Sequence, residues 1–496
     1  MAFMRSFYRK AYQDKQVNND HYTYIFIIRA NTTDHLLLMK HIGSLLILFT
    51  IHCSLFAQMP ENTLPNILKY KEICKAHIYK EMKGMYREAG GSLKYPFLAP
   101  GSSQYLDMLW DWDSWLSDVA LKQILLENGT DKDKKQALQY EEGCILNFLS
   151  YGGMDGWIPI WIERNAPSRT EMLAKRNPWK SNMHKPQLAQ HAALITKYNR
   201  NDAEWLRENF YQLQSFVDKY LNFHRHKATG LIYWETDEAI GVDNDPSTFY
   251  RPDESSGSIF LNVMMYKELK AMTYLADCLH LNEIARQYEM ESINLYNAIQ
   301  THCWDPRDGT FYSVDLNLRP VEKPTIQSLQ PGQLILHVGQ PRNYDCLLQR
   351  FDVWSSFLPM WAGIATPEQS KRMVIHYRDT ATFNAPAGIR SLSKLEKMYN
   401  VRASGNPSSW QGPVWIISNY LVFRGLVNYH YTDEARKLAQ KTILLLGRDY
   451  ERFGALHEYY LPENGEPVLN TGFQNWNLLV LNMIAWMDKK PYITEF

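Results

Sequence analysis

The alternation of short and long connections between predicted helices is the feature of this sequence that most constrains its fold. Apolar residues recur at helical spacing along most of the chain, as where Leu261, Met265 and Leu269 share one face of the segment 257–280. The same periodicity predicts twelve helices, at residues 64–88, 114–128, 133–150, 185–198, 202–224, 257–280, 282–302, 353–363, 367–378, 412–430, 432–448 and 474–488.

Connections after the even-numbered helices are very short, such as Gly129–Lys132 and Asn199–Asn201, whereas most of those after the odd-numbered helices have roughly 20 to 50 residues. Consecutive antiparallel helices place alternate connections at opposite ends, so the long connections would share one end of a closed ring of six helix pairs. The sequence therefore predicts an all-α fold, an (α/α)6 toroid or six-hairpin barrel, with long loops on one face. No repeat of fixed period is evident, which makes a solenoid less favoured.

The N-terminal residues differ from this helical body. Lys40 precedes an apolar run at residues 42–51, and a small residue, Ala57, follows it, which is the pattern of a secretory signal peptide. We therefore expect a mis-called extension at residues 1–38, a signal peptide at residues 39–57 that starts near Met39, and a single domain at residues 58–496. This interpretation predicts a periplasmic or secreted protein without stable membrane insertion after cleavage; an uncleaved N-terminal anchor is the alternative.

The charge balance disfavours two classes of partner. The chain has 53 Lys and Arg against 53 Asp and Glu, and no basic cluster stands out, which argues against nucleic acid or an anionic membrane as the main partner. Six Cys without a CxxC pair indicate neither a zinc site nor a dense disulfide framework, although one or two disulfides are compatible with an exported protein. Asp243, Asp245, Asp305 and Asp308 supply oxygens that calcium accepts, but we expect no metal and no cofactor.

One acidic stretch, residues 234–251, combines carboxylates with aromatic side chains, glycine and proline. Its carboxylates are Glu235, Asp237, Glu238, Asp243 and Asp245. Gly241 and Pro246 flank Asp243 and indicate irregular backbone rather than a helix. A carboxyl group held on such a loop beside apolar rings can have a raised pKa and donate a proton near neutral pH. The alternative is an acidic loop exposed to solvent.

Other long connections carry similar residues. The chain has 15 Trp and 31 Tyr, and a pyranose presents a flat C–H face that stacks on such rings. The candidates outside the acidic stretch are Tyr105, Trp110, Asp111, Trp112, Asp113, Gln187, Ser409, Trp410, Trp415 and Glu458. Two carboxylates on opposite loops, such as Asp243 and Glu458, are the minimum for hydrolysing a glycosidic bond, because one protonates the leaving oxygen and the other attacks the sugar or activates water. The alternatives are structural: a helix N-terminus at 110–113, a hydrogen-bonding role for Glu458 and a tight turn at 304–309.

Four short motifs stand in order along the chain, namely Trp112-Asp-Ser-Trp115, Gly241-Val-Asp-Asn-Asp-Pro246, Trp410-Gln-Gly-Pro-Val-Trp415 and Glu458-Tyr-Tyr-Leu-Pro462. With these motifs the chain, from about Tyr95 to its C-terminus, resembles the trehalase-like (α/α)6 glycoside hydrolases. The likeness is greatest to the α-glucosidase group that includes mannosylglycerate and glucosylglycerate hydrolases. The four motifs together are specific for this superfamily and much less specific for a substrate.

The resemblance implies an inverting mechanism and assigns the two acids. Asp243 would be the general acid, and Glu458 would be the general base that activates water. Residues 58–496 would form one catalytic domain that cleaves a small α-glucoside or α-mannoside of the disaccharide or glycosylglycerate type. Lys185 and Arg390 are candidates for contacts with an acidic or hydroxylated aglycone. The first subsite would be lined by Tyr105, Trp110, Asp111, Trp112, Asp113, Gln187, Gly241, Ser409, Trp410 and Trp415.

Some positions depart from the family pattern and leave other functions open. Gln411 stands where the family usually has Arg, and Phe260 stands where an acid is common. One alternative is a sugar epimerase or isomerase on the same helical ring, which would need a histidine acid/base pair, and His184 and His457 are the histidines next to candidate residues. The others are a sugar-binding barrel without activity and a phosphorylase.

Overall fold

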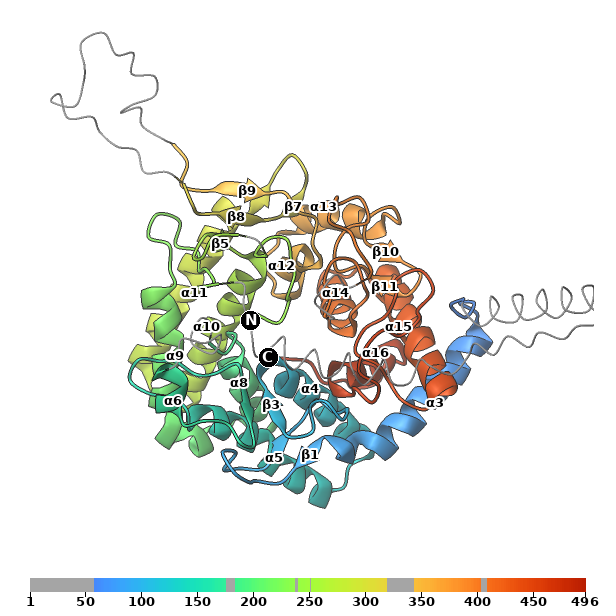
Figure 1. Ribbon diagram of the computed structural model, residues 1–496, viewed down its shortest axis with the longest axis horizontal. Coiled ribbons are helices and arrows are strands. Elements are labelled where there is room, and N and C mark those ends of the chain that lie inside the picture. The colour runs from blue at the N-terminus through green and yellow to red at the C-terminus, as the bar shows by residue number, and fades with distance from the viewer. Residues whose placement is uncertain (1–57, 175–182, 237–239, 250, 319–342, 403–407) are drawn as a thin grey trace, which may run out of the picture.

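The computed structural model describes residues 58–174, 183–236, 240–249, 251–318, 343–402 and 408–496. The expected extension and signal peptide lie outside the described residues. Helices dominate the structure and follow one another around a ring in chain order (Figure 1). Each of the twelve predicted segments contains an α-helix.

These helices are α3 (Leu64–Glu81), α4 (Asp111–Asn128), α5 (Asp131–Leu149), α8 (Leu188–Tyr198), α9 (Phe210–Phe223), α10 (Ile259–Cys278), α11 (Asn282–His302), α12 (Leu358–Trp361), α13 (Pro367–Arg378), α14 (Ile416–Asn428), α15 (Thr432–Phe453) and α16 (Val480–Met487). Three of them, α9, α12 and α16, are preceded by a 3-10 turn, at Glu204–Asn209, Trp354–Phe357 and Asn475–Leu479. A further short helix that the periodicity did not predict, α6 (Arg169–Ala174), lies in the second long connection.

Successive helices alternate between two environments. Residues 416–426 of α14 are all buried, whereas α11 buries only one face, with Tyr288, Leu295 and Ile299 inward. The even-numbered predicted helices are buried on all sides, like α14, and the odd-numbered ones bury one face, like α11. This is expected when inner helices are surrounded by outer ones. α10 accordingly packs against both α8 and α11.

The first and the eleventh of these helices are in contact. α3 packs against α15, and the two lie side by side in Figure 1. The Tyr70 ring lies directly over Gly447, where a Cβ would stand 2.4 Å from the Cβ of Tyr70. The Tyr70 hydroxyl donates to the Glu451 carboxylate over 2.8 Å. Only glycine at position 447 permits this close approach of the two helices.

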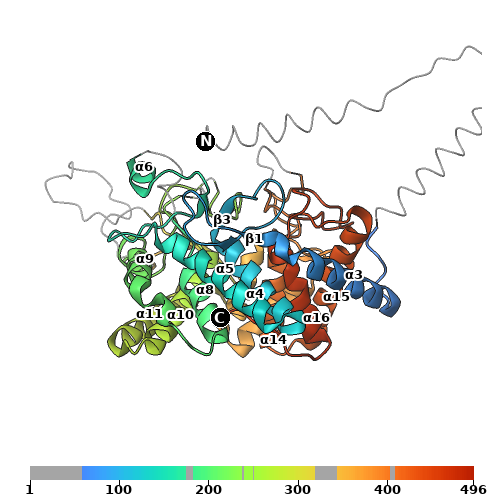
Figure 2. The same ribbon diagram turned by 90° about the horizontal axis from the view of Figure 1, so that it is seen from below.

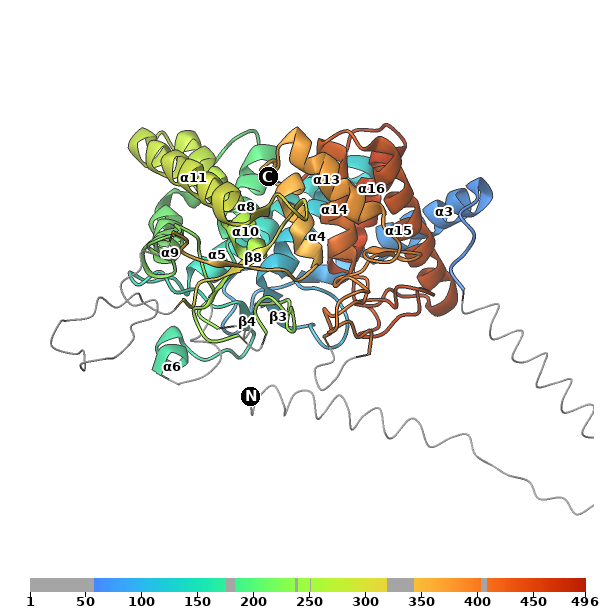
Figure 3. The ribbon, with the colours of Figure 1, turned by 90° about the horizontal axis from the view of Figure 1, so that it is seen from above.

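The two faces of the ring differ. The strand pair β3 (Met108–Trp110) and β4 (Trp161–Glu163) lies with α6 on one face, and the C-terminus lies on the opposite face (Figures 2 and 3). The other strands are β1 (Tyr86–Arg87), β2 (Phe97–Leu98), β5 (Ser256–Gly257), β6 (Trp304–Asp305), β7 (Thr310–Phe311), β8 (Ser313–Asp315), β9 (Leu347–Gln349), β10 (Asn384–Ala385) and β11 (Gly388–Ile389). They form small antiparallel sheets of two or three strands within the long connections.

The residues before the C-terminus seal the face opposite to β3 and β4. The buried Glu495 carboxylate accepts the Trp361 indole N–H over 2.6 Å and the Tyr420 hydroxyl over 2.8 Å. It also pairs with the Arg424 guanidinium at 3.1 Å. These partners come from α12 and α14, so residue 495 ties the tail to the inner wall of the ring.

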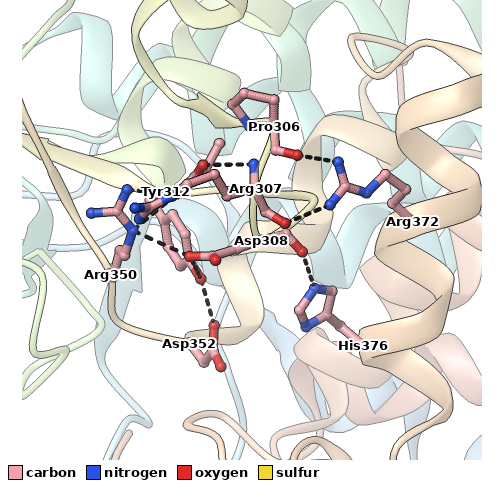
Figure 4. A network of polar contacts seen from close by, with 9 residues as sticks. Pro306, Arg307, Asp308, Tyr312, Arg350, Asp352, Arg372 and His376 are labelled. Carbon is pink, nitrogen blue, oxygen red and sulfur yellow. Dashed lines mark hydrogen bonds and ion pairs between the residues drawn. The ribbon is translucent and has the colours of Figure 1, made fainter.

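The stretch 304–309 is the predicted tight turn, between β6 and β7. Gly309, with φ of 79°, donates its N–H to the carbonyl of Asp305 over 2.8 Å. Figure 4 shows the surrounding network, in which Arg350 pairs with Asp305 at 2.7 Å and with Asp308 at 3.2 Å. A guanidinium therefore supplies the positive charge where we had considered calcium.

Metal ligands, membrane spans and disulfides can be assessed only for the parts of the chain that the structure describes. No group of three or more His, Cys, Asp or Glu in these parts is arranged to hold a metal ion. Within the same ranges, no helix has both the length and the apolar character needed to cross a bilayer. The five cysteines after residue 57 are all free thiols.

Candidate active site

The first long connection ends at the N-terminus of α4, and an ion pair anchors it there. The Asp111 carboxylate binds the Lys185 ammonium at 2.7 Å and the Lys185 backbone N–H at 3.0 Å. It also accepts the N–H of Trp112 over 2.7 Å. Both partners are only 1% exposed. This buried pair joins the first connection to the second and shows that Lys185 is held by the protein itself.

The acidic stretch passes directly over this pair. Gly241 has φ of 85°, and a Cβ there would lie 3.0 Å from the Trp112 ring and 3.2 Å from Lys185 Nζ. Glycine is required by both the backbone conformation and the contact. Asp243 follows two residues later, so the third connection reaches the site at this point.

Asn244 fixes the acidic stretch to the fifth connection. The backbone N–H of Trp410 donates to Asn244 Oδ1 over 2.6 Å. Gln411, which replaces the usual arginine, donates its side-chain amide to the Asn244 carbonyl over 3.3 Å. The carbonyl of Ser409 accepts the Trp415 indole N–H over 2.9 Å, so Ser409 supports this ring from behind.

Glu458 lies on a hairpin in the sixth connection. Its N–H donates to the Leu469 carbonyl over 2.9 Å, which pairs the two arms of the hairpin. Its carboxylate accepts the Tyr105 hydroxyl over 3.4 Å, and the other oxygen accepts the Asn470 amide. The side chain is 6% exposed. Asn470 was not among the predicted residues, because only the register of the hairpin brings it to Glu458.

The electrostatics bring the two predicted acids into one site. Burial raises the pKa of Glu458 to about 7, hydrogen bonds from Asn470 and Tyr105 oppose this rise, and the negative charge of Asp243 adds to it. Such an effect requires that Asp243 and Glu458 lie near each other, although 215 positions separate them (458 − 243 = 215). Burial also raises the pKa of Asp113 well above its usual range, with Asp111 and Glu458 contributing to the rise and Lys185 opposing it.

A tryptophan cluster lies beside this region; it consists of Trp110, Trp112, Trp161, Trp410, Trp415 and Trp476. Tyr105 links it to Glu458, because its ring contacts Trp110 with centroids 6.1 Å apart and its hydroxyl donates to the carboxylate. Trp410 and Trp415 stack with centroids 4.2 Å apart, and Trp110 stacks on Trp161 at 4.8 Å. Trp112 lies 5.8 Å from Trp410. Trp161 and Trp476 were not predicted as site residues. The pairing of β3 with β4 places Trp161 opposite Trp110, and Trp476 comes from a segment read only as helix.

Four buried polar groups in this region have no hydrogen-bond partner among the residues that the structure describes. They are the amide of Gln187, through both its N and its O, and the indole N–H groups of Trp110, Trp410 and Trp476. A buried polar group without a partner costs about 1–3 kcal/mol. Sugar hydroxyls both donate and accept hydrogen bonds, so they are the kind of partner that such groups can bind.

Arg390, which we considered for a contact with the aglycone, and the histidines His184 and His457 have partners within the protein or are buried. Arg390 pairs with Glu463 at 2.6 Å and is buried away from solvent. Burial lowers the pKa of His184 to about 4, which keeps it neutral. His457 is bound through one ring nitrogen to Asp449 at 2.9 Å. Phe260, in place of the usual acid, packs edge-on against Trp112 with centroids 5.9 Å apart.

Two carboxylates close to each other in the long connections of a helical ring are the arrangement that hydrolysis of a glycosidic bond requires. Residues 108–477 match the model of the mannosylglycerate hydrolase MGH1-like glycoside hydrolase domain, and the chain belongs to this family. The chain therefore carries a glycoside hydrolase domain, and the family resemblance drawn from the four motifs is confirmed.

Two relatives match parts of the chain. A protein of Borreliella burgdorferi is 21% identical over 333 residues, which make up 63% of this chain and 61% of that protein. Mannosylglycerate hydrolase MGH1 of Selaginella moellendorffii is 25% identical over 138 residues, 27% of this chain and 25% of that enzyme. The chain thus spans less than two thirds of the length of these curated relatives.

Solved structures share the fold. The crystal structure of the GH63 mannosylglycerate hydrolase from Thermus thermophilus in complex with glucose is similar with a TM-score of 0.58 at 19% identity, covering 81% of this chain and 98% of that one. Neutral trehalase Nth1 from Saccharomyces cerevisiae is similar with a TM-score of 0.53 at 14% identity, covering 78% and 73%.

Proposed function

We propose that this protein is an inverting α-glycosidase that cleaves a small α-glucoside or α-mannoside of the disaccharide or glycosylglycerate type. The observation that carries the proposal is the buried Glu458 carboxylate, which Tyr105 and Asn470 hold and which Asp243 approaches closely enough for its charge to act on it. Two carboxyl groups that share one sugar site are the requirement for acid/base hydrolysis of a glycoside.

In this mechanism Asp243 protonates the glycosidic oxygen as the bond from that oxygen to the anomeric carbon breaks. Glu458 takes a proton from a water that attacks the anomeric carbon from the opposite side. The product sugar has the inverted anomeric configuration. Afterwards Glu458 holds one proton more and Asp243 one fewer, and exchange with solvent restores both. With a pKa of about 7, Glu458 is a base strong enough to accept that proton near neutral pH.

The glycone would occupy the space bounded by Gln187, Trp112 and Asp113. The unpartnered Gln187 amide would bind two hydroxyls of the sugar. The proposed substrate class follows from the likeness to a mannosylglycerate hydrolase and a trehalase.

We further infer the complete architecture and the location. The alternation of buried and half-exposed helices and the α3–α15 contact support six helix pairs in one closed (α/α)6 ring, with residues 58–496 as a single catalytic domain. Residues 39–57 would be a signal peptide that exports the enzyme to the periplasm or the medium.

A substrate panel with active-site variants tests this function. Purified enzyme would be given mannosylglycerate, glucosylglycerate, trehalose and an aryl α-glucoside, and NMR would identify the anomer released first. We expect hydrolysis of at least one of these with release of the β-anomer, and loss of turnover in Asp243→Asn and Glu458→Gln. The matched control is Asp253→Asn, an exposed carboxylate just after the acidic stretch, which should remain active. Full activity in either catalytic variant, or release of the α-anomer, would refute the mechanism.

A further inference from the structure

The returning arm of the Glu458 hairpin has an unusual backbone at Asn470. This residue has φ of 45°, the left-handed region that asparagine tolerates better than most residues. The arms are paired on either side of it, by Glu458 N–H to the Leu469 carbonyl over 2.9 Å and by Gly472 N–H to the Leu456 carbonyl over 2.8 Å. The left-handed turn at this one residue lets its amide face the Glu458 side chain.

The Asn470 amide binds two groups at once. It donates to Glu458 Oε2 and also to the Tyr105 hydroxyl, the latter over 3.2 Å. Tyr105 in turn donates to Glu458 Oε1 over 3.4 Å. Both oxygens of the carboxylate are therefore held, one by each partner, and the two partners are linked to each other.

A second layer holds this arm of the hairpin in place. The hydroxyl of Thr471 lies 2.9 Å from Nε2 of His457, and Nδ1 of the same ring lies 2.9 Å from the Asp449 carboxylate. The Tyr460 hydroxyl also donates to Asp449, over 2.8 Å. Asp449 lies on α15, so the arm that carries Asn470 is tied to the body of the ring.

The charges that face Glu458 make a neutral donor important there. Asp243 and Asp113 both interact unfavourably with a negative Glu458. The Lys185 ammonium, which acts on the neighbouring Asp113, is already paired with Asp111. Among the groups that favour the charged form of Glu458, Asn470 has the largest effect, and Tyr105 follows.

We propose that Asn470 is a positioning residue for the general base: its amide orients the Glu458 carboxylate toward the attacking water and keeps it ionised near neutral pH. The inference rests on the proposed function of Glu458. It assigns to Asn470 no contact with the substrate.

The test compares Asn470→Gly and Asn470→Asp through the pH profile of kcat/KM. Glycine accepts the left-handed backbone and removes only the amide, whereas aspartate keeps the shape and replaces the donor with a second carboxylate. A base works only when deprotonated, so a raised pKa of Glu458 shifts the acidic limb of the profile to higher pH. We expect this acidic limb to move up by roughly one pH unit in Asn470→Gly, the size of one lost charge-assisted hydrogen bond, and further in Asn470→Asp. Much of the activity should return above the shifted limb.

Asn464→Gly, in the same hairpin but away from Glu458, is the matched control and should keep the wild-type limb. An unchanged limb in Asn470→Gly, or an equal loss at every pH, would overturn the inference. If the glycine variant does not fold, infrared spectroscopy replaces the pH profile as the test. The carboxyl band of Glu458 is the one that is absent from Glu458→Gln, and it reports the protonation of this residue. Its midpoint must rise in Tyr105→Phe and in Asn470→Asp. Activity in Glu458→Gln would instead refute the proposed function.

Discussion

Removing the ammonium of the buried Lys185–Asp111 pair should destabilise the protein strongly. In Lys185→Met the Asp111 carboxylate would stay buried, with two backbone N–H donors but no counter-ion. Both residues are 1% exposed and their charged atoms are 2.7 Å apart, so solvent cannot replace the lost charge. Breaking one side of such a pair costs about 3–5 kcal/mol.

The measurement is the free energy of unfolding by urea at neutral pH. The control is Lys134→Met, because Lys134 pairs with Asp131 at 4.0 Å with side chains 51% and 106% exposed, and such a pair contributes about 0–1 kcal/mol. The double variant Lys185→Met with Asp111→Asn removes the stranded charge and should recover a large part of the loss. A Lys185→Met variant that is no less stable than Lys134→Met, or a double variant that is less stable still, would refute the electrostatic argument.

Three further predictions concern stability and activity. Gly241→Ala should lose about 1–3 kcal/mol of stability through backbone strain. It should also reduce kcat/KM, because its methyl group would lie 3.0 Å from Trp112. The control is Gly363→Ala, where φ is 71° and no atom lies within 4 Å of the added methyl group; this variant has only the backbone cost and should leave kcat/KM unchanged. Glu458→Gln should be more stable than the wild type at pH 8. The pKa of Glu458 rises from 4.5 to about 7 on folding, so the folded wild type binds this proton more tightly than the unfolded chain does. The stability of the wild type therefore falls as the pH rises from 4.5 through 7, by roughly 3 kcal/mol at most. Thermal unfolding at pH 5 and pH 8 measures this, and equal stability of the two proteins at pH 8 would contradict it. Glu495→Gln should cost about 3–5 kcal/mol by leaving the buried Arg424 without its counter-ion, whereas Glu368→Gln, at an exposed pair with Lys371, should change the free energy of unfolding by less than about 1 kcal/mol.

Helical periodicity was sufficient to place the helices, because the amphipathic pattern is local. Several ends agree within a residue or two, as for α13 (Pro367–Arg378), where Thr366 and Gln369 form a capping box. The first segment was drawn too long: α3 ends at Glu81, and the residues that follow form the 3-10 turn Met82–Met85 and the strand β1. There the apolar pattern continues although the backbone changes, so periodicity alone could not mark the end.

The residues of the candidate site also fall into those that a local pattern indicates and those that it does not. Asp243, Glu458 and Trp410 could be proposed from the sequence because each lies in a short motif that the sequence displays. Asn470 and Trp161 could not, since each reaches the site through strand pairing that a local pattern does not reveal. The pair of Lys185 with Asp111 was not predicted, because this contact depends on how two long connections cross.

The sealing of the ring by Glu495 also bears on how the protein is made. Domains often begin to fold while the chain is still being synthesised, starting from the N-terminal part. Trp361, Tyr420 and Arg424 are synthesised before residue 495, so the Arg424 guanidinium has no counter-ion until that residue is in place. The order of synthesis therefore makes the pairing of Glu495 with the inner wall a late step of folding.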